Sequence, residues 1–221
     1  MNQMPSIESV THQLAWIGFR FGPKFGEVFR DEQFPVEFVD EFYKQMIPDL
    51  NSTLPKNLNP TWATLAALAA RLNGAILVGH SESGFFPERA ALVDAKGVKG
   101  IVSIESDCET DLNSGELSVL AKIPTLVIFG DHLEDVILTL TSGTWTWTTA
   151  FANCNKFIGQ LSRGGGDAQM MHLPSLGIKG NSHMLMQDKN SDLIADLVVN
   201  WIKQHVELNG KPGGLTAHPA E

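Results

Sequence analysis

A serine in a glycine-flanked turn is the first feature of this sequence that could perform covalent chemistry. Residues 79–84 read GHSESG and lie between the apolar run AILV and a segment, FFPERAALVDA, that is expected to be helical. A sharp turn from strand to helix strains its central residue and projects that side chain above the sheet, so small residues must flank it. Gly79 and Ser83 meet this need around Ser81, and the strict second glycine is displaced by one position. The pattern predicts Ser81 as a nucleophile, and the alternative is an ordinary tight loop.

A hydroxyl nucleophile needs a general base, and the segment GNSHMLMQD contains a histidine that could serve. His183 follows the last expected strand and precedes the terminal helix. Its neighbours Gly180, Asn181 and Ser182 are typical of a loop that presents a side chain. The order serine, acid, histidine along the chain is one in which this catalytic arrangement occurs. We therefore predict His183 as the base, although a single histidine is more often structural than catalytic.

Two carboxylates follow expected strand ends and compete for the role of the acid. Glu105 lies in VSIES and Asp131 lies in IFGDH. Either one could orient an imidazole and stabilise its charged form. An acid after the penultimate strand is the commonest hydrolase arrangement, which favours Asp131, whereas the alternative reading of Asp131 is a capping residue in a turn. The residues alone leave this choice open.

A sheet must position these side chains, and the pattern of apolar and helical segments from Gly74 onward indicates one. Short apolar runs alternate with helical segments, which is typical of parallel strands covered on both faces. Three strands are clear and the fourth is weaker: 75–79, 101–104, 125–129 and 169–173. A helix capped by Asn59 leads into the first strand, and a last helix is expected at 191–206. The fold class is α/β, with a mostly parallel sheet flanked by helices.

The first 58 residues have helical spacing and no convincing strand. Apolar positions recur at this spacing in Val10, Leu14, Ile17 and Phe21, and again in Phe38, Phe42 and Met46. We expect three parts: a helical, cap-like region at 1–58, the α/β core at 59–207 and a disordered tail at 208–221. Aromatic residues of the first part could line an acyl pocket: Trp16, Phe19, Phe21, Phe25 and Phe29. Such a stripe is more often core, and we favour that interpretation.

Together these segments resemble the atypical bacterial esterases of the α/β-hydrolase superfamily and their fungal relatives. The similarity runs over roughly residues 12–204 and rests on VGHSESG, IVSIES, IPTLVIFGDH and LGIKGNSHMLMQD, with AWIGFRFGP and QFPVE near the start. That family takes its acid from a glutamate one strand earlier than usual, so the resemblance implies Glu105 rather than Asp131. It also implies a serine hydrolase that cleaves carboxylic esters by acyl transfer, with no metal or organic cofactor.

Two departures from the family pattern affect the expected oxyanion hole. Glu82 stands where the family often has glutamine, and its charge would oppose a developing oxyanion unless it points away. The family also carries earlier strands and a His-Gly loop that supplies a second donor, and nothing in residues 1–73 resembles either. Only the backbone N–H of Glu82 can then be assigned to the oxyanion hole. Loss of one donor typically lowers turnover by about 100 to 1000-fold.

The resemblance therefore implies a partial α/β-hydrolase fold and leaves alternatives to an active esterase. One is a truncated or degenerate non-catalytic protein, and another is a hydrolase of an amide, lactone or thioester. With the first half of the sheet absent, an apolar edge is expected at the strand that precedes Ser81. Exposed edges of this kind pair with other chains, so self-association is a further expectation.

The composition of the chain argues against several other classes of partner and site. The 221 residues carry a formal net charge of −9 at pH 7, which disfavours nucleic acid and anionic membranes as partners and favours a small ester substrate. Cys108 and Cys154 lack metal-ligand spacing, so no metal site is expected, and one long-range disulfide stays an open alternative. The sequence has neither an export signal nor a run of 18 apolar residues, and it does not indicate a localisation.

Overall fold

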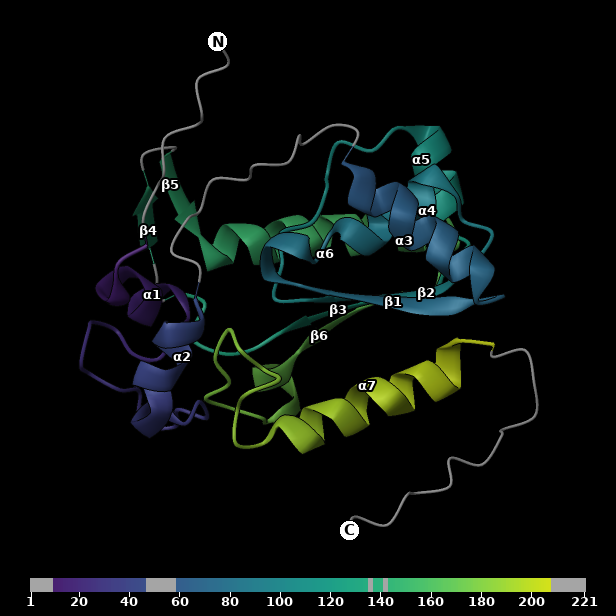
Figure 1. The fold of residues 1–221 in the computed structure, drawn as a ribbon. Coiled ribbons are helices and arrows are strands. Elements are labelled where there is room, and N and C mark those ends of the chain that lie inside the picture. Colours follow the sequence, from purple (N-terminus) through teal and green to yellow (C-terminus); the bar gives the residue numbers. More distant parts are fainter. Residues whose placement is uncertain (1–9, 47–58, 135–136, 141–142, 208–221) are drawn as a thin grey trace.

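The computed structural model describes residues 10–46, 59–134, 137–140 and 143–207, and its centre is a four-stranded sheet (Figure 1). The strands are β1 (Ala75–His80), β2 (Val98–Ile104), β3 (Thr125–Phe129) and β6 (Ala168–His172), in the order β1-β2-β3-β6. Every neighbouring pair is parallel. The four strands expected from the sequence are confirmed within three residues at their ends. A separate antiparallel pair, β4 (Ile137–Leu140) and β5 (Gly143–Thr146), precedes the longest described helix.

Helices cover both faces of the sheet, as its continuous apolar strands require. One face carries α3 (Pro60–Arg71), α4 (Phe86–Val93), α5 (Ser114–Leu120) and α6 (Trp147–Arg163), and the other carries α7 (Ser191–His205) (Figure 1). Side chains alternate between the two cores because successive strand residues point to opposite faces. Ile101 and Val127 join the core that contains residues of α3, α4 and α6. Val102 and Leu126 join the core that contains Trp201 of α7.

Local sequence explains where the helices start. The side chain of Asn59 accepts a hydrogen bond from the N–H of Thr61, and Pro60 occupies the first turn of α3, as predicted. Thr146 caps α6 in the same way. The sequence pattern did not single out α6, although its buried positions Ala150, Cys154, Phe157 and Leu161 recur every three or four residues. None of the described helices is both long and apolar enough to cross a membrane.

The N-terminal region lies at the carboxyl ends of the strands (Figure 1). It contains α1 (His12–Gly18), a short 3-10 turn (Val36–Phe38) and α2 (Val39–Gln45), and its described part has no strand apart from an isolated bridge between Lys24 and Glu27. Its aromatic stripe is partly core, because Trp16 and Phe21 are buried while Phe25 is 48% exposed. The predictions for residues 47–58 and for the tail at 208–221 lie outside the described residues.

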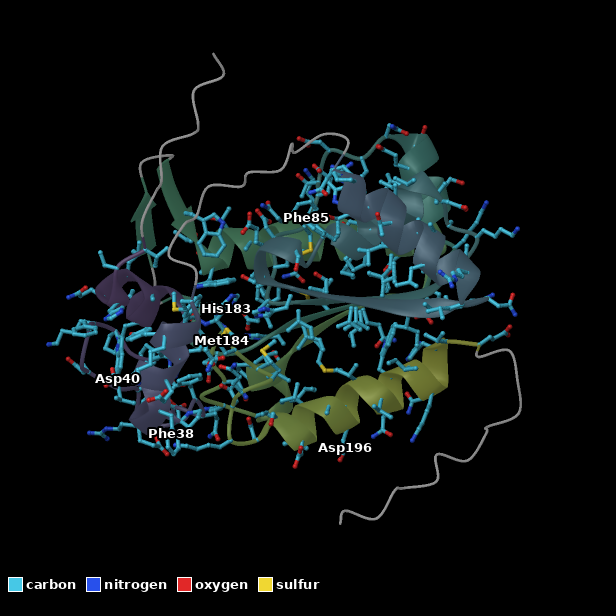
Figure 2. The ribbon with its side chains drawn as sticks, viewed as in Figure 1. Phe38, Asp40, Phe85, His183, Met184 and Asp196 are labelled. Carbon is cyan, nitrogen blue, oxygen red and sulfur yellow. A yellow bond between two sulfur atoms is a disulfide. The ribbon has the colours of Figure 1, made fainter. Side chains whose placement is uncertain are left out.

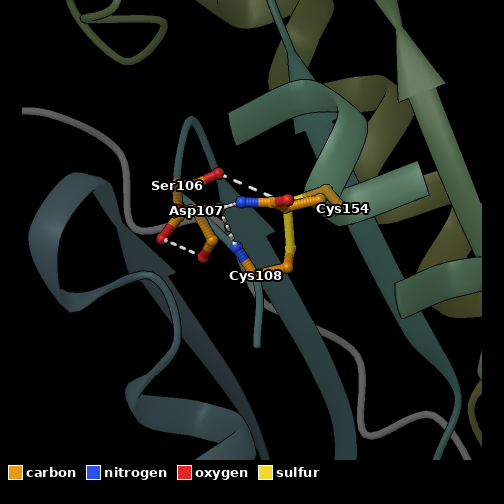
Figure 3. The surroundings of a disulfide bond; sticks show 5 residues. Ser106, Asp107, Cys108 and Cys154 are labelled. Carbon is orange, nitrogen blue, oxygen red and sulfur yellow. Dashed lines mark hydrogen bonds between the residues drawn. A yellow bond between two sulfur atoms is a disulfide. The ribbon is translucent and has the colours of Figure 1, made fainter. Parts of the chain in front are cut away.

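The two cysteines form a disulfide (Figure 3). It joins Cys108, in the loop that follows β2, to Cys154 on α6. A second contact strengthens the same connection, since the Asn153 side-chain amide donates to the Asp107 carboxylate at 2.9 Å. The alternative of one long-range disulfide is therefore the observed one, and it ties the β2 loop to the helix layer.

Candidate active site

Ser81 occupies a strained turn directly after β1. Its φ of 57° lies in the left-handed region, which L-residues other than glycine, asparagine and aspartate rarely adopt. The chain passes from β1 through a 3-10 turn (Ser81–Ser83) into α4. A side chain on Gly79 would put its Cβ 2.5 Å from the carbonyl oxygen of Ser83, so the glycine there is required by the turn itself. This is the sharp strand-to-helix turn that the sequence pattern predicts.

The displaced glycine has its own structural reason. A Cβ on Gly84 would lie 2.2 Å from the Cβ of Ser106, which immediately follows Glu105 in sequence. The missing side chain therefore lets the serine turn pack directly against the loop that carries the glutamate. Glu82, between these positions, has an exposed side chain, so its carboxylate faces solvent.

His183 lies within hydrogen-bond reach of the serine. Its Nε2 is 2.8 Å from the Ser81 hydroxyl oxygen, and the side chain is almost wholly buried. Figure 2 shows the ring between the N-terminal region and the carboxyl ends of the strands. The rings of Phe19 and Trp147 pack against the imidazole, with centroids 5.3 and 4.5 Å away. The backbone N–H of His183 donates to the Phe19 carbonyl at 3.0 Å. The histidine is thus held by residues from three separate segments.

A buried carboxylate holds the histidine loop in shape. Asp188 accepts hydrogen bonds from the Ser182 hydroxyl at 2.6 Å, the Ser182 N–H at 3.0 Å and the Asn181 side-chain amide at 2.8 Å. The other side of the loop is tied to β1, because Nε2 of His80 lies 2.9 Å from the His183 carbonyl oxygen. Since that carbonyl can only accept, the His80 ring must carry its proton on Nε2.

Glu105 lies on the far side of the imidazole from the serine. Its Oε2 is 3.4 Å from Nδ1 of His183, while its Oε1 accepts from Nη2 of Arg20 at 2.6 Å and from the Gly130 N–H. The side chain is fully buried, and its φ of 51° is also left-handed. Ser81, His183 and Glu105 therefore form one continuous line of contacts.

Asp131 uses its carboxylate differently. One oxygen accepts from the N–H of His132 at 2.8 Å, and the other accepts from the N–H of Gly180 at 3.0 Å. Asp131 therefore joins the β3 loop to the loop that carries the histidine, and its carboxylate is directed at backbone rather than at the imidazole. Asp31, Asp131 and His132 also place potential metal-ligand atoms within 4.8 Å of one another. Within this cluster, Asp131 bonds two backbone N–H groups, and Nε2 of His132 lies 2.9 Å from the Asp31 carboxylate.

Burial and nearby charges determine the protonation states of the histidine and the glutamate in this line of contacts. Burial lowers the pKa of His183 to about 4, against the opposing effect of the Glu105 carboxylate. Burial would raise the pKa of Glu105, but the charge of Arg20 and the bonds to His183 and Arg20 outweigh it and hold the pKa at about 2. At pH 7 the imidazole is therefore neutral and the carboxylate is ionised, which are the states required of a base and of the group that stabilises it.

The role of Asp188 was not predicted from the sequence, and neither were those of three residues with distant partners: Arg20, His80 and Trp147. Each acts through a contact with a residue more than 35 positions away, and arginine and tryptophan carry no local signal for such a role. Two surface pockets, of about 670 and 390 Å³, are lined by residues of α5, α6 and β6 and include none of these side chains. They supply no acyl pocket for Ser81.

Comparison with solved structures shows that the chain is similar in fold to a bacterial esterase. The atomic-resolution structure of a novel bacterial esterase matches with a TM-score of 0.81 and 40% identity, over 91% of this chain and 60% of that protein. A thermostable esterase is a remote match, at 12% identity with a TM-score of 0.46, over 72% of this chain and 39% of the other. No protein-family model and no curated protein matches the sequence. The first match confirms the predicted resemblance to bacterial esterases and the partial α/β-hydrolase fold.

Proposed function

We propose that this chain, which has the fold of part of an esterase-like α/β hydrolase, carries the nucleophile, base and acid of a carboxylic ester hydrolase. The observation that supports this most directly is the 2.8 Å contact between Nε2 of His183 and the Ser81 oxygen, with Glu105 at the other ring nitrogen. The left-handed turn at Ser81 supports the same role, because strained residues are concentrated at active sites. Similarity to a bacterial esterase supports the choice of ester substrates.

In the proposed reaction, His183 accepts the hydroxyl proton of Ser81 as the serine oxygen attacks the ester carbonyl carbon. The carbonyl oxygen becomes an oxyanion, for which the Glu82 backbone N–H is the assigned donor. Collapse of this intermediate expels the alcohol, which takes the proton from His183 and leaves an acyl group on Ser81. Water then attacks the acyl carbon with the same base, and the acid is released. Glu105 holds the ring orientation and stabilises the imidazolium in both halves.

Labelling and turnover test the proposal together. A fluorophosphonate probe is expected to modify the chain at Ser81, and hydrolysis of a p-nitrophenyl ester should require the same residue. Ser81→Ala should abolish both, whereas Ser83→Ala, which removes an exposed hydroxyl two residues away, should preserve both. Labelling that survives Ser81→Ala would refute the assignment of the nucleophile.

A non-catalytic protein with the same arrangement is the second candidate. Two observations favour this candidate. The chain spans 60% of the length of the matched bacterial esterase, and only one oxyanion donor can be assigned in it. Labelling of Ser81 without turnover of any ester would support this candidate. Turnover of an amide, lactone or thioester in preference to simple esters would instead keep the mechanism and change the substrate class.

A further inference from the structure

Arg20 is the largest fully buried side chain among the described residues, although it comes from the N-terminal region rather than from the sheet. Arginine is almost never fully buried unless it is paired. Here Nη2 bonds the Glu105 carboxylate at 2.6 Å, and Nε donates to the Asp131 carbonyl oxygen at 2.7 Å. The guanidinium also lies over the Trp147 ring, 4.5 Å from its centroid. One cation therefore contacts both loops that follow β2 and β3.

We infer that Arg20 is a positioning residue for the active site: it fixes the orientation of the Glu105 carboxylate and balances its buried charge so that the other oxygen serves His183. This inference rests on the proposed function and adds a fourth member to the line of contacts. Arg20 does not touch the reacting atoms, so it acts only through Glu105 and His183.

The division of the two carboxylate oxygens carries the geometric part of the argument. Arg20 and the Gly130 N–H both bond Oε1, which leaves Oε2 facing Nδ1 of His183. A carboxylate held at one oxygen cannot rotate freely about its last bond, so the acceptor for the imidazole stays in place. The planar guanidinium suits this task, because it presents Nε and Nη2 in fixed directions that a lysine ammonium cannot reproduce.

The position of Arg20 is itself strongly determined by its surroundings. Its backbone is left-handed, with φ of 62°, as the chain leaves α1. Trp147, which underlies the guanidinium, donates its indole N–H to the carbonyl of Gly18 at 2.9 Å. Ser81 and Glu105 also have left-handed backbones, so three of the five such non-glycine residues in the described part of the chain lie along this line of contacts. Strain concentrated in this way is typical of a functional site.

The effect of the Arg20 charge on neighbouring pKa values gives an independent test of its positioning role. The charged and titratable groups that act on His183 are Glu105 after β2, His80 on β1 and Arg20 after α1. Burial and, as a smaller effect, the charge of Glu105 raise the pKa of Asp188 in the histidine loop. The positive charge of Arg20 lowers the pKa of Glu105 and also lowers the pKa of His183, beside the larger effects of burial. Removal of that charge should therefore raise both pKa values. Whichever of these two pKa values controls the rate, the low-pH side of the activity profile (its acid limb) then moves to higher pH.

The test compares Arg20→Met, Arg20→Lys and, as a matched control, Arg30→Met, which removes an exposed arginine from the same region. We expect Arg20→Met to lower kcat and to move the acid limb of kcat/KM upward by about one pH unit or more. Arg20→Lys keeps the charge and should leave the limb near its original pH, while kcat still falls because the second hydrogen bond is lost. Arg30→Met should match the unaltered chain.

Titration of the His183 imidazole by NMR, in the full chain, separates this inference from the proposed function. A higher His183 pKa in Arg20→Met supports the role of Arg20 even if no ester is turned over. An unchanged pKa and an unchanged acid limb, with only a lower melting temperature, would make Arg20 a structural residue and overturn the inference. If Arg20→Met does not fold, Arg20→Lys decides, because wild-type kcat in that variant would contradict positioning by the guanidinium.

Discussion

The loops that follow β2 and β3 each carry a carboxylate at the same edge of the sheet, and the two are used differently. Glu105 is fully buried, and one of its oxygens faces the His183 imidazole. Asp131 is partly exposed and bonds the backbone of its own loop and of the histidine loop. Position after a parallel strand is therefore not enough to identify an acid. What distinguishes the two groups is depth of burial and the set of partners that turns one oxygen toward the ring.

The largest expected effect comes from the β2 side of this comparison. Glu105→Gln keeps the shape of the side chain but removes the charge that stabilises the imidazolium. We expect kcat for a p-nitrophenyl ester to fall by about 10³ to 10⁴-fold. Steady-state kinetics on the folded variant would check this. A loss of less than tenfold would show that Glu105 is not the acid.

Of these two loops, the disulfide involves only the β2 loop, in which Cys108 lies. The described part of the chain has no free cysteine. Replacing Cys108 and Cys154 together by alanine should lower the free energy of unfolding by about 2 to 4 kcal/mol, because the cross-link spans a long loop. Thermal and urea melts would measure the loss. Dithiothreitol should destabilise the unaltered chain to a similar extent and leave the double variant unchanged. If the free energy of unfolding were the same with and without the disulfide, the bond would not stabilise the fold by tethering the β2 loop.

A smaller effect is expected on the β3 side. Asp131→Asn weakens the hydrogen bond to the Gly180 N–H without touching the imidazole, so it should cost roughly 1 kcal/mol of stability. Turnover should fall by less than about tenfold, well below the loss expected for a group that touches the ring. The ratio of the kcat losses of Glu105→Gln and Asp131→Asn, measured under identical conditions, shows how far the two carboxylates differ in their effect on turnover. If Asp131→Asn were the more damaging of the pair, the acid would return to the β3 loop.

The smallest expected effect concerns β1, which pairs only with β2 among the described strands. Its Val78 is 58% exposed, and we propose that copies of the chain associate through this apolar edge. Val78→Lys should reduce association in light scattering and leave the Ser81 labelling rate unchanged. Val93→Lys, at a similarly exposed valine on α4, is the control and should not alter the oligomeric state. A monodisperse monomer before any substitution would refute the proposal.

Local features of this protein could be predicted from its sequence because neighbouring residues determine them. β3 (Thr125–Phe129) is buried along its whole length, and the apolar run that follows Thr125 needs no polar alternation. The turn at Ser81 is specified by small residues within three positions of it, and α3 is specified by Asn59 and Pro60 at its start. The partial α/β-hydrolase fold followed from the order of such segments together with the family resemblance.

Only the tertiary structure decided which side chains meet across the sheet. Glu105 and Arg20 are 85 residues apart, and Ser81 and His183 are 102 apart, so no local pattern relates the members of either pair. From the sequence, Glu105 and Asp131 were both possible acids at strand ends: the common strand order favoured Asp131, and the family resemblance implied Glu105. Their difference arises when the chain buries one beside a cation and an imidazole and directs the other to backbone N–H groups. Burial and partners are properties of the folded packing, because a residue type carries neither until distant segments lie side by side.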